Sequence, residues 1–236
     1  AVTPTKCGSG GGIYQAGNAD GGGAIKLSVS GTTTLDGALS ADGTNTLLPV
    51  TGGGAGGSVW LTTGQLAGSG TISASGGAGT DDGGPNPAGG GGRVAVVINS
   101  GGWGSVAMLA RGGVHPGIFD GAAGTVYRQA LGQRQLFVDN GGSTSNAFTW
   151  IPAQQAGSTN GVDRARVMVS DGANLRLYSS TIVGDIFVYS NACLTLVTND
   201  LYVNSLRHDL GGGETNSAGG TIIWQGKLPG MVFMVQ

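Results

Sequence analysis

The chain has little charge, few cysteines and few residues that favour helices. Only 10% of its 236 residues are charged, one is a glutamate (Glu214) and three are lysines. Strong helix formers are therefore too sparse to build an ordinary share of helix. What remains is dominated by Val, Ile, Thr, Ser and 50 glycines, which is typical of an all-β protein with tight turns.

The scarcity of charge also excludes classes of partner. The formal net charge is -2 and the 11 Lys and Arg residues are scattered, whereas a nucleic-acid-binding protein normally carries a basic stripe. No apolar run approaches the length of a membrane span. The first residues lack the charged and apolar regions of a signal peptide, so we expect a mature or excised segment of a longer protein. The sequence thus predicts neither a nucleic-acid partner nor a membrane partner.

Only two cysteines are present, Cys7 and Cys193, at opposite ends of the chain. In an oxidising compartment they could pair, but each can equally be a lone thiol in a turn or a core. Their number does not decide the compartment.

Glycine-led strands recur along the first half of the chain. In the first three copies two aliphatic side chains share one face and the residue between them points to the other, because side chains in a strand alternate. The copies begin 34, 35 and 32 residues apart. A self-similar unit of this length predicts a stacked, solenoid-like fold. The four copies are Gly23 to Leu27, Gly57 to Leu61, Gly92 to Val96 and Gly124 to Arg128.

Each copy is followed by a second short strand and then by an insertion rich in Gly, Pro, Asn and Asp. Residues 77–91 and 113–123 are two of these insertions. Insertions in a repeat array map to one side of the stack. We therefore expect these loops to line up along one edge, where function is most easily added.

The C-terminal part has a shorter step. Residues 167–177 align with residues 186–196 without a gap, at a spacing of 19. Gly172 is matched by Asn191, and these residue types best tolerate a left-handed turn. We therefore divide a single domain, residues 1–236, into parts. They are an entry or cap (1–21), long coils (22–161), short coils (162–225) and a C-terminal cap (226–236).

Strands and corners that alternate at this step are typical of a parallel β-helix. When coils stack in parallel, equivalent residues lie about 4.8 Å apart and repeated aliphatics form an inner ladder. An antiparallel sandwich is the alternative, but it gives no reason for a constant step. We predict an all-β parallel β-helix with long loops on one edge.

Three glycine-rich phrases, at residues 56–61, 70–77 and 89–96, resemble a known group. They are similar to the glycine-rich right-handed parallel β-helices of bacterial secreted and cell-surface proteins. Within that group the chain resembles the β-helical carbohydrate-binding modules of plant-polysaccharide-degrading enzymes. The resemblance implies a right-handed helix, a secreted module appended to a glycoside hydrolase, and xylan or a related chain as ligand.

Catalytic signatures are weak. Pectin-cleaving β-helix hydrolases combine Asp-Asp with Gly-His-Gly and Arg-x-Lys. Here Asp81 and Asp82 are adjacent, but His115 lies in Val-His-Pro and Arg-x-Lys is missing. Acid–base cleavage needs two positioned carboxyls, and a lyase would need clustered acids to hold calcium. We expect no catalytic residue and no required cofactor, although loop aspartates could hold a structural calcium ion.

An outward aromatic column favours ligand binding instead. The repeat places Trp60 and Tyr127 in one column, two coils or about 10 Å apart. A flat ring stacks on a pyranose face, and small polar neighbours bond the sugar hydroxyls. Trp103 and Trp150 lie near corners and would line the same groove or pack there. The loop edge would add hydrogen bonds from Asp81, Asp82, Arg111, His115 and Asp120.

One residue departs from the repeat. Arg128 occupies the inner column that Leu27, Leu61 and Val96 fill in the other copies. Either the fourth strand shifts its register by one residue, which would turn Tyr127 inward, or the strand bends there.

From these observations we expect a monomeric, extracellular module that binds a plant cell-wall polysaccharide such as xylan without cleaving it. Two alternatives stay open. One is a segment of a surface adhesin or fibre, because the end strands of a β-helix can pair with another chain. The other is a polysaccharide lyase.

Overall fold

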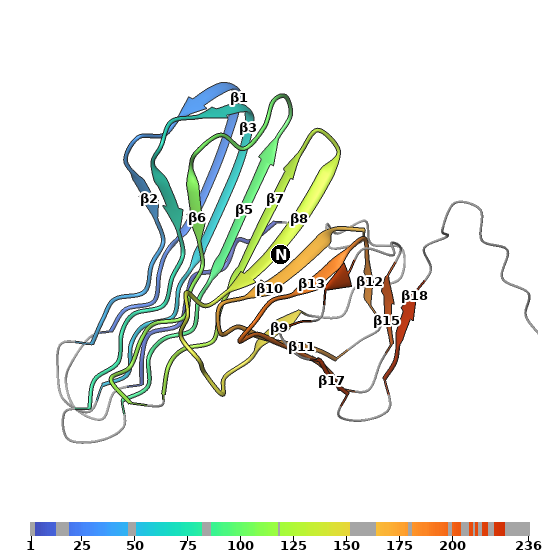
Figure 1. Ribbon diagram of the computed structural model, residues 1–236. Helices are drawn as coiled ribbons and strands as arrows, with labels where there is room; N and C mark the ends of the chain where they lie inside the picture. Colours follow the sequence, from blue (N-terminus) through green and yellow to red (C-terminus); the bar gives the residue numbers. More distant parts are fainter. Residues whose placement is uncertain are drawn as a thin grey trace, which may run out of the picture.

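The fold is an all-β solenoid (Figure 1). A computed structural model describes residues 3–12, 19–46, 51–81, 86–117, 119–151, 164–178, 181–197, 200–203, 208–209, 211, 214–216 and 220–224. These residues contain no helix, and so none long and apolar enough to cross a membrane. Stacked parallel strands form about four turns of β-solenoid. The predicted all-β parallel β-helix is confirmed.

One large sheet runs through the molecule, and three small sheets close the coils. In spatial order the large sheet contains β1 (Ala24–Thr34), β3 (Ser58–Ala67), β5 (Arg93–Ile98), β7 (Thr125–Ala130), β8 (Gln133–Asp139), β10 (Arg166–Ser170), β13 (Ile186–Val188) and β16 (His208–Asp209). The first small sheet contains β2 (Ala38–Ser40), β4 (Thr71–Ser73) and β6 (Ala107–Leu109). The second contains β17 (Glu214–Asn216), β14 (Cys193–Leu196), β11 (Asn174–Leu177) and β9 (Thr149–Ile151). The third contains β12 (Thr181–Val183), β15 (Leu201–Val203) and β18 (Ile222–Trp224).

The first four strands of the large sheet have the register that the repeat predicts. Trp60 pairs with Ala95, and Ala95 pairs with Tyr127. The fourth strand does not slip, because Val96 pairs with Arg128. Arg128 therefore lies in the inner column, as the unshifted repeat requires.

Among the described strands, the large sheet changes direction once, at a hairpin that the sequence did not predict. β7 and β8 pair antiparallel, while every other described pair of neighbouring strands is parallel. Two residues form the turn, Leu131 with φ 49° and Gly132 with φ 76°. Positive φ at both positions is typical of a type I′ turn, whose twist matches that of the flanking strands.

Reversal of the strand direction moves the coils to the other face of the sheet. Connections between parallel strands have one strongly preferred handedness. When the strands reverse but the coils continue to stack in the same direction, the connections must therefore cross the opposite face of the sheet. In Figure 1 β2 and β6 accordingly lie on one side of the large sheet, and β9, β11, β12, β15 and β18 lie on the other.

The two hydrophobic cores follow this change of face. The N-terminal core packs Val59, Leu61 and Val94 against Ile72 of the small sheet. The C-terminal core uses the alternate face, with Leu136, Val138 and Val167 packed against Leu175 and Leu194. Tyr127 pairs directly with Leu136 and so shares its face. The outer face of the N-terminal coils thus continues into the interior of the C-terminal coils.

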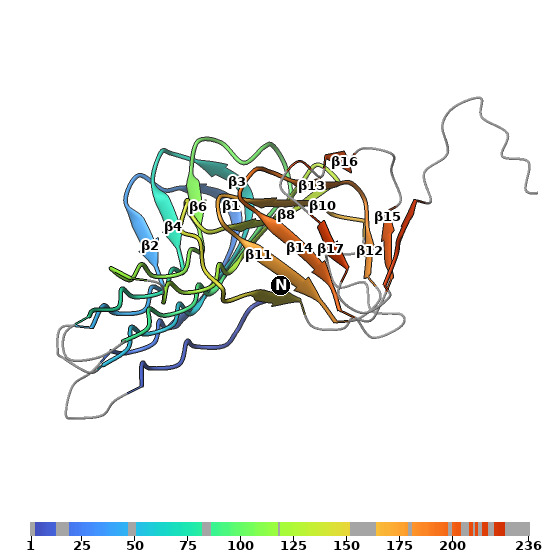
Figure 2. The same cartoon turned by 60° about the horizontal axis from the view of Figure 1, so that its bottom comes forward.

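The glycine-rich segments line up along one edge, as predicted, but they are an ordered array. Figures 1 and 2 show them as zigzag rows side by side, and they are neither helix nor strand. In segment 51–57 the amide donors follow a period of three. Gly53 and Gly56 donate to the next coil, Gly54 and Gly57 to segment 41–46, and Gly52 and Ala55 to segment 8–12. Three residues per turn is the repeat of a polyproline II helix.

Close backbone approach explains why these rows need glycine. A Cβ atom on Gly54 would collide with the carbonyl oxygen of Asp20, and one on Gly89 would collide with that of Gly54. Each row is hydrogen-bonded to neighbours that occupy the space of a side chain. The high glycine content therefore encodes an array held together by its backbone.

Candidate functional site

A row of backbone amides reaches the surface where the N-terminal segment stops covering the array. Ala55 N–H donates to the carbonyl of Ser9 at 2.9 Å. The amides of Gly54, Gly89 and Gly121 each donate to the neighbouring row in the same way, which aligns these three residues. The residues that follow them, Ala55, Gly90 and Ala122, are therefore equivalent in successive coils. Among the described residues neither Gly90 N–H nor Ala122 N–H has a hydrogen-bond partner.

These two amides lie in a groove that crosses successive coils. It consists of two adjoining hollows of about 480 and 450 Å³, and both hollows include Gly90 and Ala122. The first extends to Arg93, Phe148 and Trp150. The second extends to Phe119 and Asp120. We call the two hollows together the amide groove.

Aromatic side chains form one wall of the amide groove. Phe148 and Trp150 flank the buried Thr149 on β9 and point outward, with 39% and 58% of their surfaces exposed. Tyr178, just after β11, lies edge-on to Trp150 with 6.5 Å between ring centroids and 6.2 Å from Phe148. The Arg176 guanidinium lies 4.0 Å from the Phe148 ring centroid. Arg176 pairs with Trp150 on the adjacent strand, so Arg176 and Tyr178 extend the wall and leave the Trp150 ring accessible.

Polar groups of the large sheet complete the lining. Arg93 is exposed at the start of β5 and carries a cationic guanidinium. Thr125, its partner on β7, has a buried hydroxyl with no hydrogen-bond partner among the described residues. An unsatisfied buried hydroxyl is uncommon. The groove therefore offers a cation and two amide donors beside an aromatic ring.

The predicted stacking platform of Trp60 and Tyr127 is not present. Tyr127 is 0% exposed because the C-terminal coils bury its face of the sheet, so the expectation of an outward Tyr127 was wrong. Its hydroxyl donates to Gln129 Oε1 at 2.8 Å. Trp60 is half-buried against the same core, and the ammonium group of Lys26 lies 4.2 Å from its ring centroid. Neither ring presents a free flat face.

Burial also affects the proton affinity of two side chains near the hairpin. It raises the pKa of Tyr127, and the positive charge of Arg134 partly offsets this rise. It lowers the pKa of Arg128. Trp103 is half-buried, with the Arg128 guanidinium 4.7 Å from its ring centroid. Trp103 thus packs over Arg128 and does not belong to the amide groove.

The loop residues divide between structural and groove positions. The side chain of His115 is 0% exposed; its Nδ1 accepts the N–H of Gly117 at 2.8 Å, and its Nε2 lies 3.2 Å from Asp81. Asp120 lines the groove, but its carboxylate oxygens accept the N–H of His115 and the hydroxyl of Ser143. Burial thus prevents the expected contact of His115 with a ligand. Asp82 lies outside the described residues.

Arg111 lies away from the amide groove. Its Nε is 3.2 Å from Asp139 Oδ1, and both side chains are partly exposed. Among the described residues no three His, Cys, Asp or Glu side chains come together to hold a metal ion. Cys7 and Cys193 do not form a disulfide, and Cys7 lines the amide groove.

Of the predicted site residues, the structure brings Trp150 and Asp120 to one groove. Sequence reasoning missed Gly90, Arg93, Ala122 and Phe148. The equivalence of Arg93 and Thr125 was visible in the repeat, but an unpaired backbone amide leaves no mark in a sequence. Comparison of the chain with protein-family models, curated proteins and solved structures finds no match.

Proposed function

We propose that the amide groove binds a polysaccharide without cleaving it. The observation that carries the proposal is the row of unpaired amides, Gly90 and Ala122, which leads to the exposed ring of Trp150. Exposed aromatic rings stack on the apolar faces of pyranoses, and convergent polar groups fix the orientation of a ligand.

The N-terminal segment supports the choice of a ligand rich in oxygen. At the first position of the row, Ser9 places a carbonyl oxygen on Ala55 N–H. An incoming chain would do the same at Gly90 and Ala122, which belong to successive coils about 4.8 Å apart. A linear glycan presents hydroxyl and ring oxygens at short, regular intervals. It would therefore lie along the solenoid axis, across the coils.

The charge of the groove favours a glycan with acidic substituents. Arg93 is the cationic side chain that lines the amide groove, and it would form charge-assisted bonds with a glycan carboxylate. Within the plant cell-wall polysaccharides suggested by the sequence, xylan with glucuronate side groups fits this chemistry. The resemblance of the sequence supports a secreted module appended to a glycoside hydrolase.

Binding without cleavage is supported by the side chains of the groove. Asp120 is its single carboxylate among the described lining residues, and both its oxygens already accept hydrogen bonds. Glycoside hydrolysis generally requires two carboxyls placed on either side of the scissile bond. We therefore assign the groove a binding role.

Affinity gel electrophoresis and calorimetry with glucuronate-bearing xylan test the proposal. Loss of the ring in Trp150→Ala is expected to weaken binding about tenfold. Gly90→Leu is expected to abolish it by filling the groove. A Cβ on Gly90 meets only the Ala122 carbonyl, at 3.8 Å, so the array itself tolerates the change.

Tyr189→Ala is the matched control, because Tyr189 is 43% exposed and lies outside the groove. It should bind as the parent does. The proposal fails if Trp150→Ala and Gly90→Leu retain the affinity of the parent for every polysaccharide that the parent binds.

A further inference from the structure

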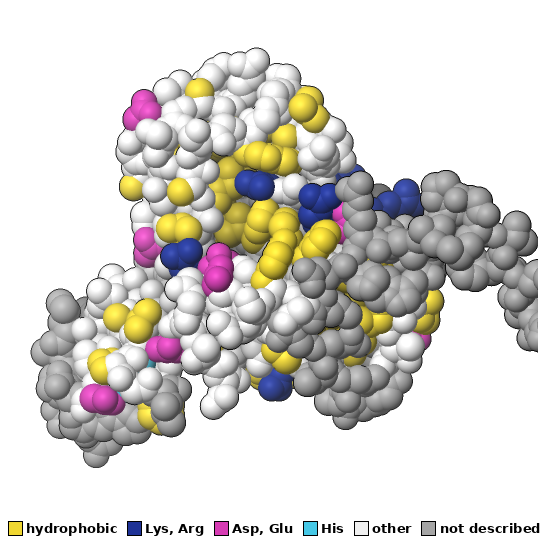
Figure 3. All heavy atoms as spheres, in the orientation of Figure 1, with side chains coloured by type: hydrophobic (Ala, Val, Ile, Leu, Met, Phe, Trp, Pro, Cys, Tyr) yellow, Lys and Arg dark blue, Asp and Glu magenta, His cyan; other side chains and the backbone are white. Residues whose placement is uncertain are grey.

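The core of the N-terminal coils is open at the hairpin. Its inner ladder runs Leu39, Ile72, Met108 along the small sheet and ends there, because β6 is the last strand of that sheet. The chain that would have formed the next rung turns back at β7 and β8 instead. Figure 3 shows hydrophobic side chains gathered in a hollow on this face of the molecule, with Lys and Arg side chains beside them.

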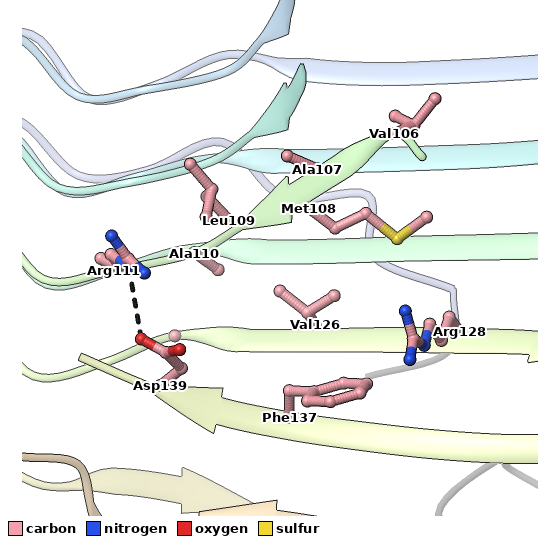
Figure 4. A pocket seen from close by; sticks show the side chains of 11 residues that line it. Val106, Ala107, Met108, Leu109, Ala110, Arg111, Val126, Arg128, Phe137 and Asp139 are labelled. Carbon is pink, nitrogen blue, oxygen red and sulfur yellow. Dashed lines mark hydrogen bonds and ion pairs between the residues drawn. The ribbon is translucent and has the colours of Figure 1, made fainter. Parts of the chain in front are cut away.

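The open end is a cavity of about 210 Å³ between the two sheets. Met108, Val126 and Phe137 line it, and Figure 4 shows their side chains around one common space. Arg128 lies at one end, and the ion pair of Arg111 with Asp139 lies at the other. The cavity is therefore an apolar chamber with a guanidinium at each end.

The two guanidinium groups differ in what they are free to bind. Arg111 is already paired with the carboxylate of Asp139. Arg128 donates through Nε to Gln135 Oε1 at 2.7 Å and lies between the rings of Trp103 and Phe137. No carboxylate pairs with Arg128 among the described residues. Its charge is thus held in place by aromatic rings and a neutral amide.

We propose that this cavity binds a small monocyclic aromatic carboxylate, with the carboxylate on Arg128 and the ring among Met108, Val126 and Phe137. An apolar cavity of about 150 Å³ holds benzene, so one of about 210 Å³ holds a ring with a short side chain. A planar guanidinium matches a carboxylate in a bidentate fork. Partial burial of Arg128, which lowers its pKa, also strengthens an ion pair there.

A strand from another chain is the competing occupant, because β6 is a sheet edge. β6 has only three residues, and short edge strands are poor templates for pairing. The isolated charge of Arg128 has no role in such pairing. The small carboxylate therefore explains more of the site.

Calorimetric titration of the full chain tests this site with 3-phenylpropanoate and its uncharged analogue 3-phenylpropan-1-ol. The parent is expected to bind the acid with a Kd of about 1 mM or tighter, and about tenfold more tightly than the alcohol. Arg128→Gln should remove this preference, while Arg128→Lys should keep part of it. Met108→Trp should block both ligands by filling the cavity.

Arg166→Gln is the matched control, since it makes the same change of charge at a residue that lines neither the cavity nor the amide groove. It should leave binding of the acid unchanged, and the acid should bind whether or not a polysaccharide does. Equal affinity of the parent for acid and alcohol would overturn the role of Arg128. Failure of the parent to bind either compound, or binding that survives Met108→Trp, would overturn the site.

Discussion

The N-terminal and C-terminal coils share one sheet but are stabilised in different ways. In the N-terminal coils the positions next to the glycine array are small and buried, with Ala41, Ala74 and Ala110 at 3%, 0% and 4% exposure. In the C-terminal coils, inner positions are filled by large side chains such as Leu175 and Leu194. The N-terminal half combines its apolar core with an array of backbone hydrogen bonds at close range, whereas the C-terminal half is packed by large apolar side chains.

A high glycine content is compatible with stability when the backbone itself is the packing surface. Glycine weakens ordinary strands because it has no side chain to pack. In the array the carbonyl groups of neighbouring rows occupy the space that a side chain would fill. Enlarging a residue should therefore damage the glycine array, whereas truncating a residue should damage the apolar cores.

The largest effect is expected from Gly54→Ala, which would break the N-terminal half. The added Cβ collides with the carbonyl of Asp20 in a row that cannot move without losing hydrogen bonds. We expect the free energy of unfolding to fall by about 3 kcal/mol, measured by denaturant titration. Gly23→Ala is the control, because its Cβ meets nothing within 4 Å. Equal stability of the two variants would contradict the account of the array.

A middle-sized effect is expected from Tyr127→Phe, where the two halves meet. Loss of the hydrogen bond to Gln129 should cost about 1 kcal/mol at neutral pH. Burial raises the pKa of Tyr127, so the folded state keeps the phenol proton at a pH where the unfolded chain has lost it. The contribution of this group is therefore complete below about pH 10 and is lost as the pH rises further.

Denaturant titrations of the parent and Tyr127→Phe between neutral and alkaline pH measure how this contribution to stability changes with pH. The advantage of the parent should shrink as the pH rises above about 10. A constant difference in the free energy of unfolding across that range would show that Tyr127 is not buried between the halves.

The smallest effect is expected from Leu131→Asn, at the hairpin that separates the N-terminal from the C-terminal coils. Leu131 has a φ of 49° and is 72% exposed, so its side chain gains little from packing. Asparagine tolerates positive φ far better, and Asn-Gly is the preferred type I′ turn. We expect the free energy of unfolding to rise by about 0.5–1 kcal/mol, seen as a higher Tm. A loss of stability would contradict the assigned turn.

The sequence predicted the architecture of the first coils. It did not predict that the later coils lie on the other face of the large sheet. Constant spacing of the glycine-led strands predicted the register from Trp60 to Tyr127 correctly. The hairpin was missed because its turn begins with leucine, which gives no turn signal. Once the sheet reverses, an outward side chain of the first coils becomes an inward one, and the buried position of Tyr127 follows.

For a related reason, only part of the candidate site could be predicted from the sequence. Trp150 was recognised as an aromatic near a corner, but its exposure depends on which face of the large sheet β9 covers. The donors at Gly90 and Ala122 are main-chain amides, and segment 8–12 determines which amides of the row have a hydrogen-bond partner. Such groups are determined by topology and not by side-chain type.

The repetition of the glycine rows would allow the proposed amide groove to change in length. Successive rows place equivalent amides at Ala55, Gly90 and Ala122, and Ser9 covers the first of them. Duplication of a single repeat unit would lengthen this line of donors by one step without disturbing the leucine-rich coils beyond the hairpin. If the groove binds a polysaccharide as proposed, copying one segment would extend recognition to longer chains with no new side chain required.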